Sequence, residues 1–141
     1  MTSTILELRV TPPWERDIQG VLARLTIPHA FDSKKPSICT RRYQSMDWME
    51  HAPATEWESA KTFPVEPERA RELLTKVLAV NVPLTTPSLS GIHVTAYHLK
   101  IFSVASCCEF HWYNEPPSQW RCLFEIAEGV RALADEVLGP A

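Results

Sequence analysis

Two histidines and a glutamate are the residues of this sequence best suited to chemistry. The segments "HVTAYHLKIF" and "CCEFHWY" both alternate apolar and polar residues, and "SVAS" between them has a common hairpin-loop length. Pairing them as a hairpin puts His98 opposite His111. Lys100 then lies opposite Glu109 on the same face. Two imidazoles and a carboxylate could share a metal ion or serve a hydrolase or transferase.

The simpler interpretation of this face is structural. A lysine and a glutamate directly across two strands are an ordinary stabilising pair of a sheet. The sequence also has no glycine-rich phosphate loop, no Gly-x-Ser-x-Gly, no His-Glu-x-x-His and no Cys-x-x-Cys. We therefore assign no catalytic residue, no metal ligand and no cofactor.

The thiols have a structural interpretation too. Adjacent residues of a strand point to opposite faces, so Cys108 is expected in the core and Cys107 outside it, without a disulfide between them. Cys107 and His111 would be roughly 13 Å apart along the strand, too far for a thiol-imidazole pair. Cys39 and Cys122 are expected to fill small apolar gaps, and all four thiols to be reduced.

The segment "SMDWMEHAPATEWE" is the strongest candidate for binding a partner. Methionine and tryptophan are over-represented in protein interfaces, and this stretch has no periodicity that would bury them in a helix or strand. The alternative is a loop that folds its aromatic side chains over the core. The candidate partner-binding residues are Met46, Trp48, Met49 and Trp57.

A basic stretch precedes this segment, with Lys34, Lys35, Arg41 and Arg42 beside Tyr43. Such a patch could meet nucleic acid or an acidic partner, but in a chain of net charge -3 it is expected to be a solvated face.

Periodicity predicts the elements that must position these residues. Ile5–Val10 alternates as a strand, and the spacing of Trp14–Leu25 predicts a helix, weakened by Gly20. Between Pro28 and Pro64 the pattern is faint, with strands expected in Ser37–Met46 and in "WESAKTF" and an irregular connection between them. A helix begins at Pro67 and ends before Asn81, and a loop follows it.

The hairpin and a closing helix complete the chain. Phe102 opposite Cys107 sets the register, which buries an apolar row of Tyr97, Leu99, Ile101, Cys108, Phe110 and Trp112. After "NEPP", Ser118 is expected to cap a helix that Gly139 and Pro140 end. Trp112 and Trp120 are expected to anchor the core.

These elements predict an α+β fold: an antiparallel sheet with helices packed on one face, and a C-terminal β-hairpin followed by a closing helix. The 141 residues, 45% of them hydrophobic, suit a single domain over 1–141. No apolar run could span a bilayer and no secretory signal is visible, so we expect a cytoplasmic protein without membrane contact.

The C-terminal part resembles the tail of a number of small uncharacterised bacterial proteins. The features that carry the resemblance are Gly91, Tyr97-x-Leu99, the strand ending in Trp112, and Pro116-Pro117-x-x-Trp120-x-x-Leu123. The order of helix, hairpin and closing helix is also similar to emfourin, a proteinaceous inhibitor of thermolysin-like metalloproteases. This similarity covers roughly the last seventy residues, rests on core and turn positions, and implies no inhibitory residue.

We therefore expect a non-enzymatic protein that binds another protein by surface contact, as an inhibitor, an immunity factor or a subunit of a larger assembly. The alternative is a small hydrolase or transferase that uses His98, His111 and Glu109. The acidic balance disfavours nucleic acid, and a homo-oligomer is compatible with the sequence.

Overall fold

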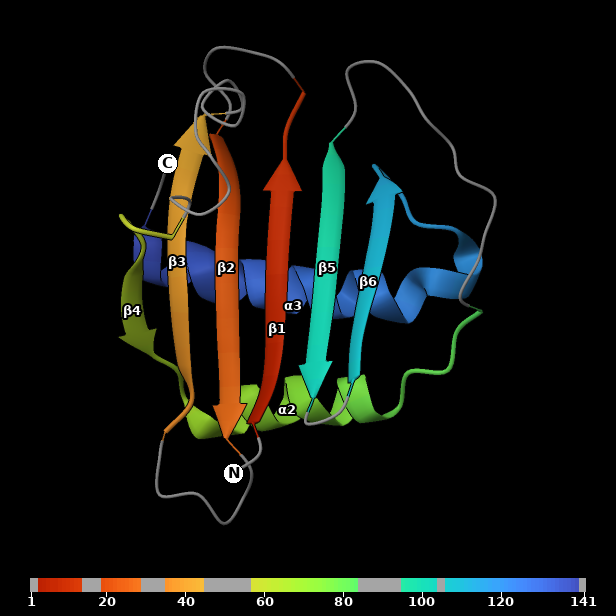
Figure 1. The fold of residues 1–141 in the computed structure, drawn as a ribbon, viewed down its shortest axis with the longest axis horizontal. Helices are drawn as coiled ribbons and strands as arrows, with labels where there is room; N and C mark the ends of the chain where they lie inside the picture. Colours follow the sequence, from red (N-terminus) through yellow and green to blue (C-terminus); the bar gives the residue numbers. More distant parts are fainter. Residues whose placement is uncertain are drawn as a thin grey trace.

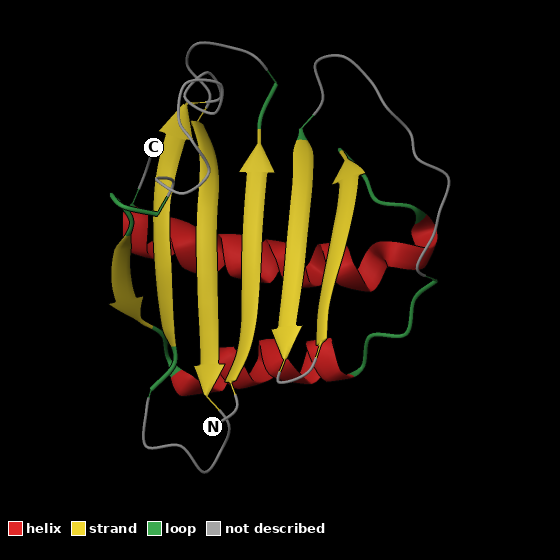
Figure 2. Cartoon of the chain, viewed as in Figure 1, coloured by secondary structure: helices red, strands yellow, loops and turns green. Residues whose placement is uncertain are grey.

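An antiparallel sheet and two α-helices make up the part of the chain that the computed structural model describes, residues 3–13, 19–28, 35–44, 57–83, 95–103 and 106–139 (Figures 1 and 2). The elements in chain order are β1 (Ser3–Thr11), β2 (Gln19–Pro28), β3 (Ser37–Gln44), β4 (Lys61–Pro64), α2 (Pro67–Leu78), β5 (Ala96–Ser103), β6 (Ser106–Tyr113), the 3-10 turn η2 (Ser118–Trp120) and α3 (Arg121–Leu138).

The sheet has six strands in the order β4-β3-β2-β1-β5-β6, and every neighbouring pair is antiparallel. Strands β1 to β4 follow one another across the sheet. After α2 the chain returns to the other side of β1, where β5 pairs with it and β6 completes the sheet. The first strand of the sequence is therefore at the centre of the sheet.

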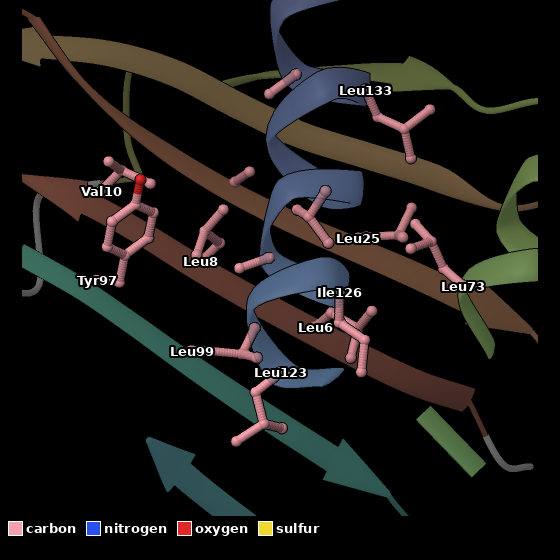
Figure 3. Close-up of a cluster of buried hydrophobic side chains, with 14 of the residues drawn as sticks. Leu6, Leu8, Val10, Leu25, Leu73, Tyr97, Leu99, Leu123, Ile126 and Leu133 are labelled. Atoms are coloured by element: carbon pink, nitrogen blue, oxygen red, sulfur yellow. The ribbon is translucent and has the colours of Figure 1, made fainter. Parts of the chain in front are cut away.

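Both helices lie on the same side of the sheet, behind the strands in the view of Figure 1. Helix α3 crosses the strands, and its Leu123, Ile126 and Leu133 reach the apolar side chains of β1, β2 and β5, with Leu73 of α2 beside them (Figure 3). The side chains of this core that are fully enclosed include Leu6, Leu8, Leu25, Ile38, Leu99, Leu123, Ile126 and Val130. The predicted α+β class, with the helices on one face of an antiparallel sheet, is confirmed.

The helix predicted over Trp14–Leu25 is wrong: residues 19–28 form strand β2, and Trp14 to Ile18 lie outside the described residues. Both Val21 and Leu22 are buried, although they point to opposite faces. A strand buried on both faces has a continuous apolar run, which periodicity alone cannot distinguish from a helix. Hydrogen bonding to β1 on one side and β3 on the other decided the structure.

The other predicted strands are mostly confirmed. The expected strand over Ile5–Val10 is the middle of β1, and β3 fills most of the predicted Ser37–Met46 strand. In "WESAKTF" the first residues form a turn, and β4 is confined to Lys61–Pro64.

The hairpin has the predicted register, with Phe102 opposite Cys107 and Leu99 opposite Phe110. The predicted burial of Cys108 is wrong, because this cysteine is exposed. Trp120 packs edge-on against Phe110, with ring centroids 5.3 Å apart, so the helical layer meets β6 towards its C-terminal end. Cys108 lies nearer the hairpin turn, where an inward position on an edge strand stays open to solvent.

The other two predicted helices are present, with one correction at a terminus. Helix α2 begins at Pro67 as expected, and Gly139, with a positive φ of 76°, follows the last residue of α3. Ser118 does not cap a helix; it begins η2 without a side-chain capping bond, and its hydroxyl contacts the Gln119 side chain instead. The core role predicted for Trp112 and Trp120 is confirmed, since both are buried.

Candidate functional site

The face of the sheet opposite the helices carries a group of polar residues in mutual contact. We call it the open face. Strand register places on it the outward side chains of β1, β2, β3, β5 and β6, which include Glu7, Arg9, Leu22, Arg24, Arg41, His98, Lys100, Glu109 and His111.

Alternating charges form a row across four strands of the open face. Glu7 lies between Arg24 of β2 and Lys100 of β5 in the register, and Lys100 faces Glu109 of β6. Arg24 Nη2 donates to Glu7 Oε1 at 2.8 Å, and Lys100 Nζ lies 3.2 Å from Glu109 Oε1. The hydrogen bond from Lys100 holds the pKa of Glu109 below its usual range. The predicted Lys100–Glu109 pair is therefore present as one link of a longer row.

The two imidazoles of the hairpin are stacked. Their ring centroids are 3.9 Å apart and the planes differ by 24°. His98 Nε2 is enclosed, and its nearest carboxylate oxygen among the described residues is Glu109 Oε1, 3.4 Å away.

Burial is the main reason that the pKa of His98 is lowered from its ordinary value of 6.5. Electrostatic repulsion from His111, Lys100 and Arg9 lowers this pKa further, and the Glu109 carboxylate opposes it. His98 is therefore a neutral imidazole at neutral pH. A neutral imidazole can accept a proton, which is the one chemical capability that this cluster has by itself.

The cluster does not have the form of a metal centre. Among the described residues, no group of three or more histidine, cysteine, aspartate or glutamate side chains is arranged to hold a metal ion. The stacking places the imidazoles face to face, whereas two ligands of one ion direct nitrogen lone pairs at a common point.

Trp57 is the only one of the four predicted partner-binding residues that lies within the described residues; Met46, Trp48 and Met49 lie outside them. Its ring lies on the guanidinium of Arg24, 4.3 Å from the ring centroid. Two residues later, Ser59 Oγ accepts a hydrogen bond from Arg41 Nη1 at 2.5 Å. The turn at 57–59 thus lies on the open face, over β2 and β3.

The predicted basic patch is divided between the two faces of the sheet. Arg41 points to the open face, whereas Arg42 points to the helices and donates to the carbonyl oxygen of Gly139 at 2.7 Å. Lys34 lies outside the described residues, and Lys35 precedes β3 in an exposed position. Alternation along β3 is the reason, since consecutive arginines of a strand cannot share a face.

The outward strand residues of the open face include more cations than carboxylates. Among its strand residues, four cations face two carboxylates, namely Arg9, Arg24, Arg41 and Lys100 against Glu7 and Glu109. The whole chain has a net charge of -3. Sequence reasoning missed Glu7, Arg9 and Arg24 as members of this site, because only the pairing of β1 with β2 and β5 brings them beside the hairpin.

The thiols are all free in the structure. Cys107 and Cys108 are both exposed, and Cys39 and Cys122 are half-buried. The prediction that the adjacent cysteines are not bonded to each other is confirmed.

No protein-family model matches the chain, and no curated protein has significant sequence similarity to it. None of the described helices combines the length and the apolar composition that crossing a membrane requires.

Proposed function

We propose that this protein is a non-enzymatic binding module whose open face contacts an acidic surface of another protein. The observation that carries the proposal is the set of outward strand side chains of that face, in which Arg24 and Lys100 lie in one row with Glu7 and Glu109, and Arg41 lies in the adjacent row. A partner with exposed carboxylates would be attracted to these cations, which orients the encounter. The role of the complex would be inhibition, immunity or assembly, and the resemblance to emfourin supports the first of these.

The pattern of charges favours a protein over a nucleic acid. Glu7 lies between Arg24 and Lys100, and Glu109 follows Lys100, so a continuous line of phosphates would meet a carboxylate at every second position of the row. A protein surface can match alternating charges individually. The ion pairs Arg24–Glu7 and Lys100–Glu109 also hold these side chains in place before binding, which reduces the entropy lost on association.

Trp57 provides the apolar part of the contact. It is half-buried and held against Arg24, so its position on the open face is already established. Tryptophan and arginine are the residue types that most often dominate binding energy at protein interfaces. Cation–π stacking of the two places both in one small area.

A second candidate function, a hydrolase or transferase reaction at the hairpin, has one observation in its favour. His98 is neutral at neutral pH, with Glu109 Oε1 3.4 Å from its Nε2, as a base with an orienting carboxylate would be. Stacking on His111 covers one side of the ring, however, and the Glu109 carboxylate also binds Lys100. We favour binding because the His98–His111 stack and the Lys100–Glu109 ion pair hold these side chains in place as part of a stable surface.

Affinity capture from the native host with the full chain as bait, followed by binding isotherms with the captured partner, tests the proposal. Trp57→Ala should weaken binding by about 2 kcal/mol or more with little change in melting temperature. Leu78→Ala is the matched control, because Leu78 is 77% exposed on α2, away from the open face. This control should leave affinity unchanged.

Salt and stability measurements complete the test. Binding to an acidic surface should weaken as ionic strength rises. If the Trp57→Ala protein has a lower melting temperature but binds at full affinity when folded, Trp57 only covers the sheet. Loss of binding in Leu78→Ala, with Trp57→Ala unaffected, would place the contact on the helical side and overturn the proposal.

A further inference from the structure

Strand β6 forms an edge of the sheet without the short length or the proline with which many proteins protect edges. It pairs with β5 and has eight residues, "SCCEFHWY", with no proline, lysine or glycine among them. The opposite edge strand, β4, has four residues and ends in Pro64. Short length and proline are common means of preventing strand addition, and they occur only on the β4 side.

The hairpin register determines which backbone groups of β6 point to the open edge. Asn114 N donates to the carbonyl oxygen of Thr95 at 2.8 Å, so residues 95 and 114 are a hydrogen-bonded pair. Such pairs alternate with non-bonded pairs in an antiparallel ladder, so Phe110 and Trp112 bond to β5. The remaining residues, Cys107, Glu109, His111 and Tyr113, direct their backbone N–H and C=O groups away from β5.

These four outward residues are accessible along the whole strand. Each is exposed, and Tyr113 is 42% exposed. No hydrogen bond between described residues uses their outward backbone groups. In Figure 1, α3 and the turn before it continue past β6 on the helical side of the sheet. An added strand would therefore have a helix beneath its inward side chains.

We propose that the β6 edge binds an extended segment of a partner protein as a seventh, antiparallel strand. The side chains of β6 define the chemistry of that segment. A lysine or arginine fits opposite Glu109, and a carboxylate fits opposite His111. The intervening residues face the helical side, beside Cys108, Phe110 and Trp112, and should be apolar. The edge shares the Glu109 and His111 side chains with the open face, but it binds through backbone groups of β6 that the open-face contact does not use, so the inference goes beyond the proposed function.

The synthetic peptide Thr-Val-Glu-Val-Lys-Val-Thr is the probe, because its antiparallel addition places lysine opposite Glu109 and glutamate opposite His111. In the free protein, amides of Cys107, Glu109, His111 and Tyr113 should exchange hydrogen faster than those of Phe110 and Trp112. The peptide should slow the exchange of the outward set. Exchanging its lysine and glutamate should weaken binding, because like charges then meet at Glu109.

Variants at one position separate backbone pairing from side-chain charge. Glu109→Pro removes an outward N–H that β5 does not use, so the hairpin should persist while peptide affinity falls at least about tenfold. Glu109→Gln keeps the N–H and should reduce affinity only about threefold or less, as an exposed ion pair contributes little. A peptide N-methylated at its pairing positions should fail to bind and requires no change in the protein.

Three results would overturn the inference: an absence of amide protection by the peptide, equal affinity of Glu109→Pro and wild type, or full binding of the N-methylated peptide. Trp57→Ala should leave peptide binding unchanged. These measurements therefore distinguish a failure of the proposed peptide binding at the β6 edge from a failure of the proposed partner binding at the open face.

Discussion

His98 is the residue whose surroundings depart most from those of an ordinary side chain on a sheet. It stacks on His111 of β6, lies opposite Arg9 of the neighbouring strand β1, and lies beside Lys100 and Glu109. Partial burial, and repulsion by the nearby cations Lys100 and Arg9, oppose its protonation. The open face therefore includes one group whose charge state is coupled to the stability of the fold.

The pH dependence of folding should reveal this coupling. The pKa of His98 is lower in the folded than in the unfolded chain, so the unfolded state binds a proton more readily as pH falls below about 6.5. Stability should therefore decrease between about pH 7 and pH 5. Urea unfolding of His98→Gln should show a weaker dependence over this range, because the substituted amide does not titrate.

Glu109 provides an internal check of that assignment. Its pKa is lowered as well, so its contribution to stability is lost at more acidic pH, as the carboxylate becomes protonated below its ordinary range near 4.5. Glu109→Gln should remove the change at the acidic end of the curve, and it should steepen the decrease between about pH 7 and pH 5, because the lost carboxylate no longer raises the pKa of His98. Equal slopes for wild type and His98→Gln would contradict the role given to His98.

At the scale of elements, β2 is an interior strand with little space around it. It is hydrogen-bonded on both sides and buried on both faces near its start. Gly20 is required there, because an added Cβ would lie 2.5 Å from Tyr43 Cζ and 2.6 Å from the Val10 carbonyl oxygen. The Tyr43 hydroxyl in turn contacts Thr11 Oγ1 at 2.6 Å, so the ring has little freedom to move.

Gly20→Ala should destabilise the protein by about 1–3 kcal/mol, since the new methyl group meets a backbone carbonyl and a held ring. Gly129→Ala is the matched control in α3: its Cβ would meet the flexible end of Leu73, and alanine favours a helix by about 1 kcal/mol. Thermal or urea unfolding of the two variants gives the comparison. If both variants cost the same, the close approach at Gly20 is not the cause.

At the scale of the whole molecule, α3 joins the two halves of the chain. It packs across strands from both ends of the sequence, and Arg42 of β3 reaches its C-terminus. Arg42 Nη2 donates to the Gly139 carbonyl oxygen at 2.7 Å and lies 3.3 Å from Asp135 Oδ1. A cation at a helix C-terminus stabilises the carbonyl groups that lack partners within the helix.

Arg42→Ala should lower the free energy of unfolding by about 1–2 kcal/mol, because one substitution removes a hydrogen bond and a cation at the helix end. Arg42→Lys should recover part of this loss, since it keeps the charge but not the planar donor group. Arg41→Ala is the neighbouring control on the other face, where Arg41 bonds an exposed serine. A larger cost for Arg41→Ala would contradict this account.

Much of the architecture was predictable from local sequence. Alternation identified β1 and the hairpin, helical spacing and Pro67 identified α2, and the apolar stripe after Trp120 identified α3. The hairpin register followed as well, because a slip of one residue would expose Phe110 and bury Glu109. In each case the residues that make the decisive contacts are near one another in the sequence.

Tertiary structure decided what depends on contacts between distant segments. The spacing of apolar residues in β2 predicts a helix, but the segment is a strand because it pairs with β1 and β3 and is buried on both faces. No local pattern contains that information. Cys108 has an inward position but lies beyond the cover of the helices. The open face exists only because β1 is central: its Glu7 and Arg9 meet the hairpin about ninety residues later in the chain. Sequence by itself therefore determined the elements and their inward faces, whereas pairing order determined which polar residues share a surface.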